Sequence, residues 1–272
     1  MDDQKNQCET CSEKSDKCDA GSCEKIQKLP QNQYNEIKHV VGVMSGKGGV
    51  GKSSVTALLA MGLKKQGFNV GILDADITGP SIPKIFGATE RPGNHFDYLL
   101  PVSSATGIKL MSINLLLPNE DDPVIWRGPI LAGAVKQFWT DVAWGRLDYL
   151  IVDLPPGTGD VPLTTMQSLP LDGMVVVTSP QKLAQMVVRK AIKMAAQLDV
   201  PVLGMVENMS YLTCPDCGKK IDVFGPSQAE EVSFREGIKL LEILPIDPKL
   251  AELCDQGRVE QYETEAFTRV TL

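Results

Sequence analysis

The chain has 272 residues, of which 43% are hydrophobic, enough for one well-packed α/β domain with a short appendage but not for a second full domain. It carries 34 acidic against 27 basic residues, so no overall positive field attracts nucleic acid or anionic lipid. The first residues lack the apolar stretch of a signal peptide, and no apolar run reaches the roughly 20 residues that span a bilayer. We therefore expect a soluble cytoplasmic protein without nucleic-acid or membrane partners. In that reducing compartment, closely spaced cysteines more often bind metal than form disulfides.

The chain divides into two parts of different composition. Residues 1–36 hold cysteines among charged and amide side chains and have too few apolar residues to pack a core. From residue 37 to 272, short β-branched runs alternate with helical periodicities, such as the apolar stripe from Lys182 to Leu198. The expected strands are 39–44, 69–73, 148–152, 174–178, 202–206 and 239–244. This alternation predicts an α/β fold with a doubly wound, mainly parallel sheet.

A phosphate-binding loop follows the first predicted strand. The segment GKGGVGKS fits G-x-x-x-x-G-K-[ST] and precedes a helix-like run. Its glycines let backbone N–H groups surround a phosphate, and the helix N-terminus adds partial positive charge. Lys52 should reach the β- and γ-phosphates of ATP, while the Ser53 hydroxyl ligates Mg²⁺. The predicted nucleotide-binding residues of this loop are Gly46, Lys47, Gly48, Gly49, Val50, Gly51, Lys52, Ser53 and Ser54.

A second lysine in this loop extends the pattern to K-G-G-x-G-K-S. With Lys47, the loop resembles the deviant Walker A group of P-loop ATPases, which includes MinD, ParA and the nitrogenase iron protein. In that group the extra lysine reaches across a dimer to the nucleotide of the partner. The segment Asp74-Ala75-Asp76 resembles the group's first switch, whose second carboxylate orients or activates the attacking water. The resemblance therefore implies a homodimeric ATPase with Lys47, Lys52 and Asp76 as its catalytic residues.

Other carboxylates follow predicted strands, where α/β sheets place ligands. Asp153 begins the segment DLPPGTGD, which resembles the second switch, and should hold Mg²⁺ through water as a Walker B aspartate does. Within that segment, the Gly157 amide is placed to meet the γ-phosphate, and Asp160 is interpreted as a helix N-cap. Asp74 fits either the outer shell of Mg²⁺ or the capping of a strand end. The predicted Mg²⁺ site is Ser53, Asp76 and Asp153.

Further segments narrow the resemblance to one family. DITGPS (76–81), WRGP (126–129), DLPPGTGD (153–160), ENMS (207–210) and CPDCG (214–218) occur in this order. Together they resemble the Mrp/ApbC family of iron–sulfur cluster carrier ATPases over about residues 37–272. The resemblance implies a protein that carries a 4Fe–4S cluster to apo-proteins and receives it from cluster donors. It also implies that Asn208 contacts the adenine and that the loop of Pro245 and Asp247 lines the base. The chemistry of Arg127 does not follow from the motif, and a structural role in its loop fits equally well.

Cys214 and Cys217 form a C-x-x-C with proline between them and glycine after them. A tight turn of this kind presents two sulfurs on one side, which is half of a tetrahedral site. Because no second pair lies nearby in sequence, we expect the same pair on a second subunit to complete the ligand set. One bridging 4Fe–4S cluster per homodimer would result. A shared Zn²⁺ and a redox dithiol are the alternatives.

The N-terminal segment carries the pattern C-x2-C-x6-C-x4-C. Its cysteines are Cys8, Cys11, Cys18 and Cys23. A bound metal is the expected ordering agent for so polar a segment. Eukaryotic cytosolic relatives also carry four N-terminal cysteines but space them differently, so a second Fe–S cluster, Zn²⁺ and a metal-free tail all stay open. Cys254 has no partner pattern and is interpreted as a buried or incidental thiol.

Two other function classes share the loop pattern. A DNA-segregating ATPase like ParA would favour a basic surface, and a positioning ATPase like MinD a basic amphipathic C-terminal helix. The C-terminal residues 260–272 are instead acidic or neutral. An electron-transfer protein resembling the nitrogenase iron protein is the stronger alternative, but its cysteines come from separate segments. The adjacent pair in this chain favours a carrier of a releasable cluster.

Overall fold

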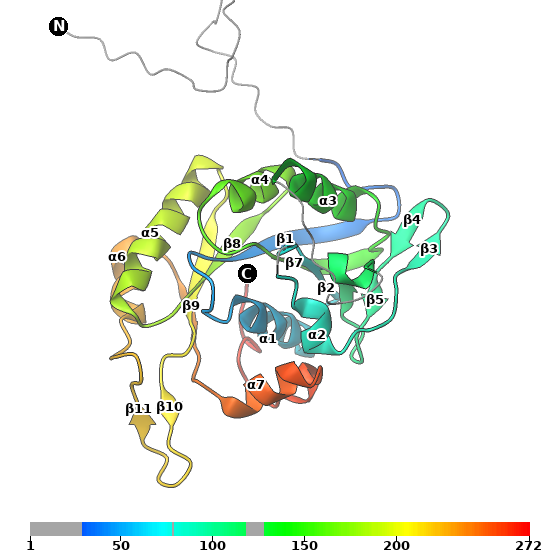
Figure 1. Ribbon diagram of the computed structural model, residues 1–272. Coiled ribbons are helices and arrows are strands. Elements are labelled where there is room, and N and C mark those ends of the chain that lie inside the picture. The colour runs from blue at the N-terminus through cyan, green and yellow to red at the C-terminus, as the bar shows by residue number, and fades with distance from the viewer. Residues whose placement is uncertain (1–28, 78, 118–127) are drawn as a thin grey trace, which may run out of the picture.

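A computed structural model describes residues 29–77, 79–117 and 128–272 of the chain. Its centre is an eight-stranded sheet in the order β12-β9-β8-β1-β7-β2-β6-β5, with helices on both faces (Figure 1). The strands are β1 (Glu36–Ser45), β2 (Val70–Asp74), β5 (Val102–Ser103), β6 (Lys109–Met111), β7 (Arg146–Asp153), β8 (Gly173–Thr178), β9 (Val202–Glu207) and β12 (Leu240–Ile243). All neighbouring pairs run parallel except β5 with β6. The predicted doubly wound, mainly parallel sheet is confirmed.

Helices cover the sheet in two layers. One layer holds α3 (Gly128–Thr140), α4 (Asp160–Ser168), α5 (Lys182–Gln197) and α6 (Ala229–Glu236). The other layer holds α1 (Lys52–Lys65), α2 (Ile82–Phe86) and α7 (Pro248–Asp255) (Figure 1). The described residues also form two 3₁₀ turns, η1 (Ile113–Leu115) and η2 (Val259–Gln261). The predicted helix 182–198 is present as α5. The interpretation of Asp160 as an N-cap is off by one residue, because α4 begins at Asp160 and Gly159 takes the cap position.

The central strand β1 is buried on both faces. Val40 and Met44 belong to the core under α3, α4 and α5, whereas Val41 and Val43 belong to the core under α1 and α2. Each fully buried side chain of this size contributes about 1.5–3 kcal/mol to folding. Because β1 is held from both sides by β7 and β8, the loop that leaves its C-terminal end starts from a rigid position.

Two hairpins stand outside the sheet. One pairs β3 (Gly93–His95) with β4 (Tyr98–Leu100). The other pairs β10 (Leu212–Thr213) with β11 (Lys220–Ile221) and projects from the body of the molecule (Figure 1). Its base is tied to the domain by a bridge between Leu212 and Ile246. This second hairpin carries the C-x-x-C segment.

Residues 29–35 lie against the domain. The Asn32 side-chain amide donates to the carbonyls of Thr140 and Val142, and the Trp139 indole donates to the carbonyl of Leu29. The N-terminal cysteines Cys8, Cys11, Cys18 and Cys23 lie outside the described residues, so the segment boundary near residue 36 stays a prediction. In the described part of the chain, no helix is both long enough and apolar enough to cross a membrane.

Candidate functional site

The predicted phosphate loop connects β1 to α1 and is shaped by glycine. Gly49 and Gly51 have φ values of 79° and 76°, in the left-handed region that costs a residue with a Cβ roughly 1–2 kcal/mol. Gly51 is the N-cap of α1 and no side chain caps that end. The backbone N–H groups of the first turn are therefore available to an anion.

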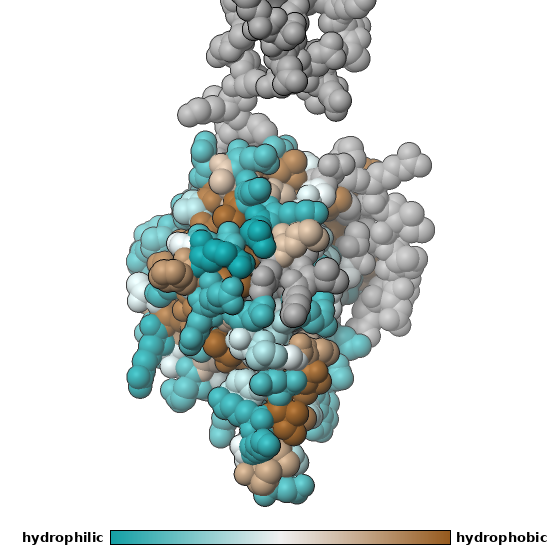
Figure 2. Space-filling model, turned by 90° about the vertical axis from the view of Figure 1, so that its left-hand side faces the viewer, coloured by the Kyte–Doolittle hydropathy of each residue, from teal (hydrophilic) through white to brown (hydrophobic). Residues whose placement is uncertain are grey.

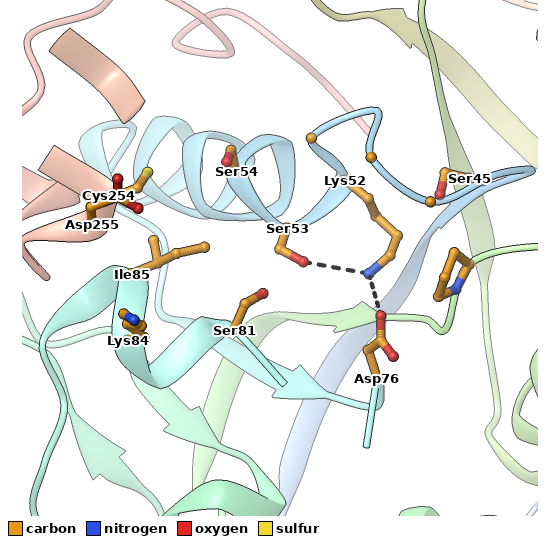
Figure 3. A pocket seen from close by; sticks show the side chains of 14 residues that line it. Ser45, Lys52, Ser53, Ser54, Asp76, Ser81, Lys84, Ile85, Cys254 and Asp255 are labelled. Atoms are coloured by element: carbon orange, nitrogen blue, oxygen red, sulfur yellow. Dashed lines mark hydrogen bonds and ion pairs between the residues drawn. The ribbon is translucent and has the colours of Figure 1, made fainter. Parts of the chain in front are cut away.

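A cavity of about 390 Å³ opens at this loop (Figure 3). Lys52 and Asp76 lie at one end of it, and Cys254 and Asp255 of α7 lie at the other. The lining residues are Ser45, Gly48, Gly49, Gly51, Lys52, Ser53, Ser54, Asp76, Ser81, Lys84, Ile85, Pro156, Cys254 and Asp255. The cavity thus joins the carboxyl end of the sheet to the N-terminus of α1, which is where doubly wound folds bind phosphate ligands.

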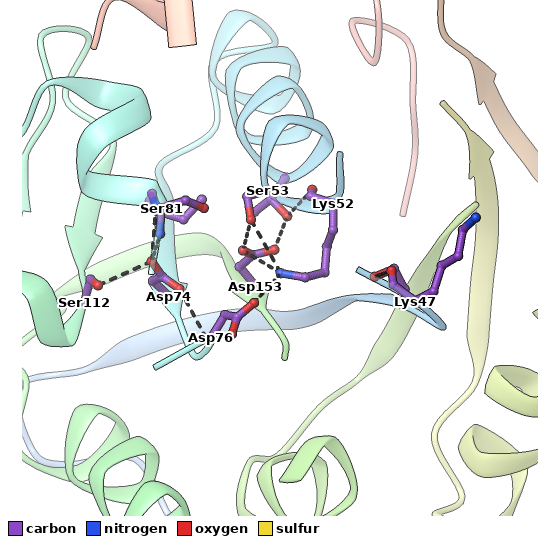
Figure 4. Close-up of polar contacts among 11 residues, drawn as sticks. Lys47, Lys52, Ser53, Asp74, Asp76, Ser81, Ser112 and Asp153 are labelled. Atoms are coloured by element: carbon purple, nitrogen blue, oxygen red, sulfur yellow. Dashed lines mark hydrogen bonds and ion pairs between the residues drawn. The ribbon is translucent and has the colours of Figure 1, made fainter. Parts of the chain in front are cut away.

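The buried carboxylate of Asp153 contacts three side chains at the start of α1 (Figure 4). The Lys52 ammonium lies 2.8 Å from Asp153 Oδ2 and 3.6 Å from Asp76 Oδ2. The Ser53 hydroxyl donates to the same Asp153 oxygen over 2.6 Å, and the Thr56 hydroxyl donates to Asp153 Oδ1 over 2.7 Å. Thr56 was not predicted, although its place one helical turn after Lys52 puts both on one side of α1. The structure therefore brings Lys52, Ser53, Asp76 and Asp153 together, and their roles toward nucleotide and metal stay predictions.

This donor set fits a magnesium ion. The Ser53 hydroxyl and the carboxylates of Asp76 and Asp153 are hard oxygen ligands, and all three groups lie around the Lys52 ammonium. Two carboxylates face one lysine, so the group carries excess negative charge that a divalent cation would compensate. Each of these groups is now bonded to another protein group, and nucleotide with metal would replace those contacts.

Asp74 lies behind this group and is fully buried. Burial, followed by the negative charge of Asp153, raises the pKa of Asp74 above the ordinary carboxyl value, and Lys52 and the Ile82 N–H, which favour the carboxylate, oppose that rise. Its Oδ1 accepts the backbone N–H of Asp76 over 3.2 Å. The oxygens of Asp74 are thus used by backbone groups of the loop, as the capping interpretation expects.

Lys47 points away from the Lys52 group (Figure 4). Its side chain is half-buried and donates a hydrogen bond to the Gln181 side-chain carbonyl, just before α5. The Gly157 N–H donates to the carbonyl of Ser45 over 2.8 Å, so it would have to change partner to reach a phosphate. Within one chain, neither group lies among the residues that line the cavity.

Of the residues predicted around the base, Asn208 contacts the phosphate loop, and neither Asn208 nor Pro245 nor Asp247 is among the residues that line the cavity. Asn208 Nδ2 donates to the carbonyl of Val50 over 2.9 Å, which fixes the loop from the side of β9. Asp247 caps α7 through the backbone N–H of Lys249 and accepts the Tyr262 hydroxyl over 2.6 Å. Burial, together with that hydrogen bond to Asp247, raises the pKa of Tyr262. Pro245 lies between β12 and α7.

The cysteine pair lies at the tip of the β10–β11 hairpin. Cys214 is half-buried and Cys217 is exposed. Gly218, with a φ of 70°, closes the turn by donating its N–H to the carbonyl of Cys214. The backbone N–H groups of Cys217 and Asp216, with the Cys217 side chain, lower the pKa of the Cys214 thiol. A lowered pKa raises the thiolate fraction, which is the form that binds metal.

Exposed apolar side chains follow this turn in the sequence. Ile221, Val223 and Phe224 are 45%, 49% and 42% exposed. Figure 2 views this side of the molecule and shows hydrophobic surface at its lower end, where the hairpin projects. Among the residues that the structure describes, no group of three or more histidine, cysteine and acidic side chains is placed to hold a metal ion. The pair therefore offers a metal two ligands per chain, next to an exposed apolar surface.

Some residues of the cavity were missed by sequence reasoning. The short helix α2 contributes Ser81 at its N-cap, Lys84 and Ile85, and α7 contributes Cys254 and Asp255. Only Ser81 carried a signal, as the last residue of the DITGPS segment. Cys254 is buried as predicted, and burial raises the pKa of its thiol. Arg127 lies outside the described residues.

Sequence comparison identifies relatives of the chain. A ParA-type family model described as "NUBPL iron-transfer P-loop NTPase" matches residues 36–271. The iron–sulfur cluster carrier protein of Clostridium perfringens is 47% identical over 241 residues, which cover 85% of this chain and 84% of the relative. The iron–sulfur cluster carrier protein of Methanocaldococcus jannaschii is 44% identical over 254 residues, covering 92% and 88%.

Solved structures share the fold. A nucleotide-binding protein from Archaeoglobus fulgidus in complex with ADP matches with a TM-score of 0.79 at 48% identity, covering 87% of this chain and 93% of that chain. MinD from Pyrococcus horikoshii, complexed with Mg-ADP, matches with a TM-score of 0.60 at 19% identity, covering 85% and 93%, and shows the fold alone. The family match, the relatives and the loop geometry agree with the predicted Mrp/ApbC resemblance, and the chain belongs to the ParA-type family of iron-transfer P-loop NTPases.

Proposed function

We propose that this protein is an ATP-hydrolysing carrier that assembles a 4Fe–4S cluster between two copies of the chain and transfers it to apo-proteins. The observation that carries the proposal is the C-x-x-C hairpin: Cys214 and Cys217 are accessible, and they supply half of a cluster's ligands. The names of the bacterial and archaeal relatives support the same cargo.

In the proposed nucleotide site, the loop amides and Lys52 bind the phosphates of ATP. Ser53, Asp76 and Asp153 would hold Mg²⁺, which when bound would neutralise charge on the phosphates. Asn208, with the loop of Pro245 and Asp247, is proposed to recognise the base. Support comes from the contacts that join Lys52, Ser53 and Asp76 to one another and to Asp153 beside the cavity, and from the contact between Asn208 and the loop.

For hydrolysis, we assign Asp76 to orienting the attacking water and Lys47 to stabilising charge on the nucleotide of the partner chain. In the single chain, the Lys47 side chain hydrogen-bonds to Gln181 outside the cavity of its own chain and does not contact the group around Lys52. This position leaves Lys47 able to reach the nucleotide of a partner chain across a dimer interface. A trans-acting lysine makes a specific prediction, because the two residues of one active site then come from different chains.

A mixing experiment tests this arrangement. Lys47→Ala and Asp76→Asn proteins, each inactive alone, form mixed dimers in which one site keeps its own Asp76 and receives Lys47 from the other chain. An equal mixture should recover about one quarter of wild-type turnover, because half of the dimers are mixed and one of their two sites is intact. A Lys249→Ala control, changed at an exposed residue, should keep full activity. No recovery in the mixture would place Lys47 on its own nucleotide.

Cluster transfer distinguishes a carrier from an electron-transfer protein. Reconstituted protein, prepared without oxygen, is mixed with an apo-iron–sulfur enzyme in the presence of a chelator that captures free iron. A carrier should lose its iron and sulfide together as the acceptor gains activity. If the cluster instead remains on the protein and cycles its oxidation state, the electron-transfer alternative is correct.

The remaining metal assignments belong to the same proposal. We propose that the N-terminal segment with Cys8, Cys11, Cys18 and Cys23 binds a second metal centre, and that the protein works in the cytoplasm, where thiols stay reduced. Iron, sulfide and zinc analysis of wild-type protein against a variant with these cysteines changed to serine tests the centre. Equal metal content in both proteins would remove it from the account.

A further inference from the structure

The carboxylate of Asp74 accepts hydrogen bonds from both ends of the loop that carries Asp76. Asp74, the last residue of β2, accepts the N–H of Asp76 on Oδ1 over 3.2 Å. On Oδ2 it accepts the N–H groups of Ser81 and Ile82 over 3.1 and 3.2 Å. The two oxygens therefore bind both ends of the loop, and the second end is also the start of α2.

A second element holds this loop from β6. The Ser112 hydroxyl, fully buried at the N-cap of η1, donates to Asp74 Oδ2 over 3.3 Å. Asn114, in η1, donates its side-chain amide to the carbonyl of Pro80 over 3.4 Å. The loop is thus attached to η1, which directly follows the neighbouring strand β6, as well as to its own strand β2 (Figure 4).

The held loop places Asp76 beside the phosphate lysine. Asp76 Oδ2 lies 3.6 Å from the Lys52 ammonium, and Asp76 and Ser81 both line the cavity. Asp74 itself is fully buried and is not among the described lining residues. Asp74 therefore does not line the site itself, and its hydrogen bonds act on a bound nucleotide through the groups that they hold.

We propose that Asp74, assisted by Ser112, is a positioning residue for ATP hydrolysis that fixes the loop so that the Asp76 carboxylate faces the γ-phosphate. The inference rests on the proposed ATPase function and adds to it a residue that does not touch the substrate. In the proposed site, the phosphates are bound by Lys52 and by the backbone amides of the phosphate loop, which lie outside the loop that Asp74 holds. Loss of the Asp74 hydrogen bonds, which we call the clamp, should therefore lower turnover and leave nucleotide binding intact.

The Asp74→Asn variant tests the clamp with little change of shape. An amide retains one acceptor oxygen but loses the other, so one end of the loop is released. We expect kcat to fall about tenfold or more, as a catalytic group misplaced by an ångström does, with the ATP dissociation constant within about twofold of wild type. Asp172→Asn is the control for the loss of a carboxylate that accepts a backbone N–H, because Asp172 accepts that of Val40 but is exposed and lies just before β8, outside the cavity lining. Its kcat should equal wild type.

A double-mutant cycle separates positioning from general stability. If Asp74 acts through Asp76, the Asp74→Asn/Asp76→Asn protein should turn over at the rate of Asp76→Asn alone. Independent additive losses would overturn the inference. Ser112→Ala, which removes one hydrogen bond, should lower kcat by a smaller factor, and it decides the question if Asp74→Asn fails to fold. If the wild-type protein hydrolyses ATP and both Asp74→Asn and Ser112→Ala do so at the same rate, the clamp is refuted but the ATPase function is not. A wild-type protein without ATPase activity refutes the proposed function, and the clamp with it.

Discussion

Replacing Lys52 with methionine should both abolish tight ATP binding and destabilise the nucleotide-free protein. The Lys52 side chain is 6% exposed and Asp153 is fully buried, with their charged atoms 2.8 Å apart. Methionine fills similar space without the charge, so Asp153 is left as a buried carboxylate. Its other donors, the hydroxyls of Ser53 and Thr56, remain.

The size of the loss follows from this geometry. At an effective dielectric constant of about 20, unit charges separated by 2.8 Å attract by about 6 kcal/mol. The desolvation of both ions offsets part of that attraction, and the remaining hydroxyl donors stabilise the orphaned carboxylate. Removing one partner of a buried pair costs about 3–5 kcal/mol, which lowers the melting temperature of a domain of this size by roughly 6–20 °C.

The assay is thermal unfolding without nucleotide, followed by equilibrium titration with ATP. Lys38→Met is the matched control, because Lys38 lies at the same 2.8 Å from Asp148 but their side chains are 55% and 19% exposed. Water and salt screen that pair, so its melting temperature should stay close to wild type. Lys52→Met/Asp153→Asn should melt above Lys52→Met, since the buried charge is then removed. A Lys52→Met protein that melts with the control and still binds ATP tightly would refute the reasoning.

The other predictions concern the loop, the water-positioning residue and the thiols. Gly51→Ala should weaken ATP binding at least tenfold, because a Cβ at this left-handed position overlaps the side-chain amide of Asn208. Asp76→Asn should slow turnover on the order of 10²-fold or more while ATP still binds, because the attacking water loses its orienting group. Iodoacetamide should modify Cys214 before Cys254 at pH 7, because a lowered pKa enlarges the thiolate fraction of the first and a raised pKa reduces that of the second.

The predictions for Gly51, Asp76 and the thiols can each be contradicted by a specific result. Gly107 is also left-handed, but the nearest atom lies 3.8 Å from an added Cβ, so the Gly107→Ala control should bind ATP normally. Equal losses of ATP affinity in both variants would show that backbone strain, and not the overlap with Asn208, is responsible. An Asp76→Asn protein with normal turnover would exclude Asp76 from catalysis. Peptide mapping follows alkylation, and the rate difference between the thiols should shrink as rising pH ionises both. Faster labelling of Cys254 would contradict the assigned pKa directions.

The parts of the fold that the sequence predicts are those with a strong local pattern. Strands such as β7 and β8 read as continuous apolar runs because both faces of a parallel sheet are covered by helices. By contrast, β5 and β6 have two and three residues, too short for a period to be recognised. The helix α2 has five residues and contains Pro83, so it shows no helical stripe either.

The site divides in the same way. Lys52 and Ser53 were predictable from the glycine-rich loop motif, and Asp76 and Asp153 because they lie at or just after strand ends, which parallel strands bring to one edge of the sheet. The Cys254 side of the cavity was not predictable, because α7 reaches it by tertiary packing against α2, which lies about 170 residues earlier in the chain. The dual attachment of Asp74 likewise depends on β6, which the local sequence does not reveal.

The central claim is that two chains share one cluster, and iron stoichiometry tests it most directly. The full-length chain is used with its N-terminal cysteines changed to serine, which leaves Cys214 and Cys217 as the paired thiols. The residues changed are Cys8, Cys11, Cys18 and Cys23. After anaerobic reconstitution, we expect a dimer with about four iron and four sulfide per two chains, which a further Cys217→Ser change should discharge without loss of ATP binding. A monomer with a full cluster in each chain, or a protein that takes up only zinc, would contradict the account.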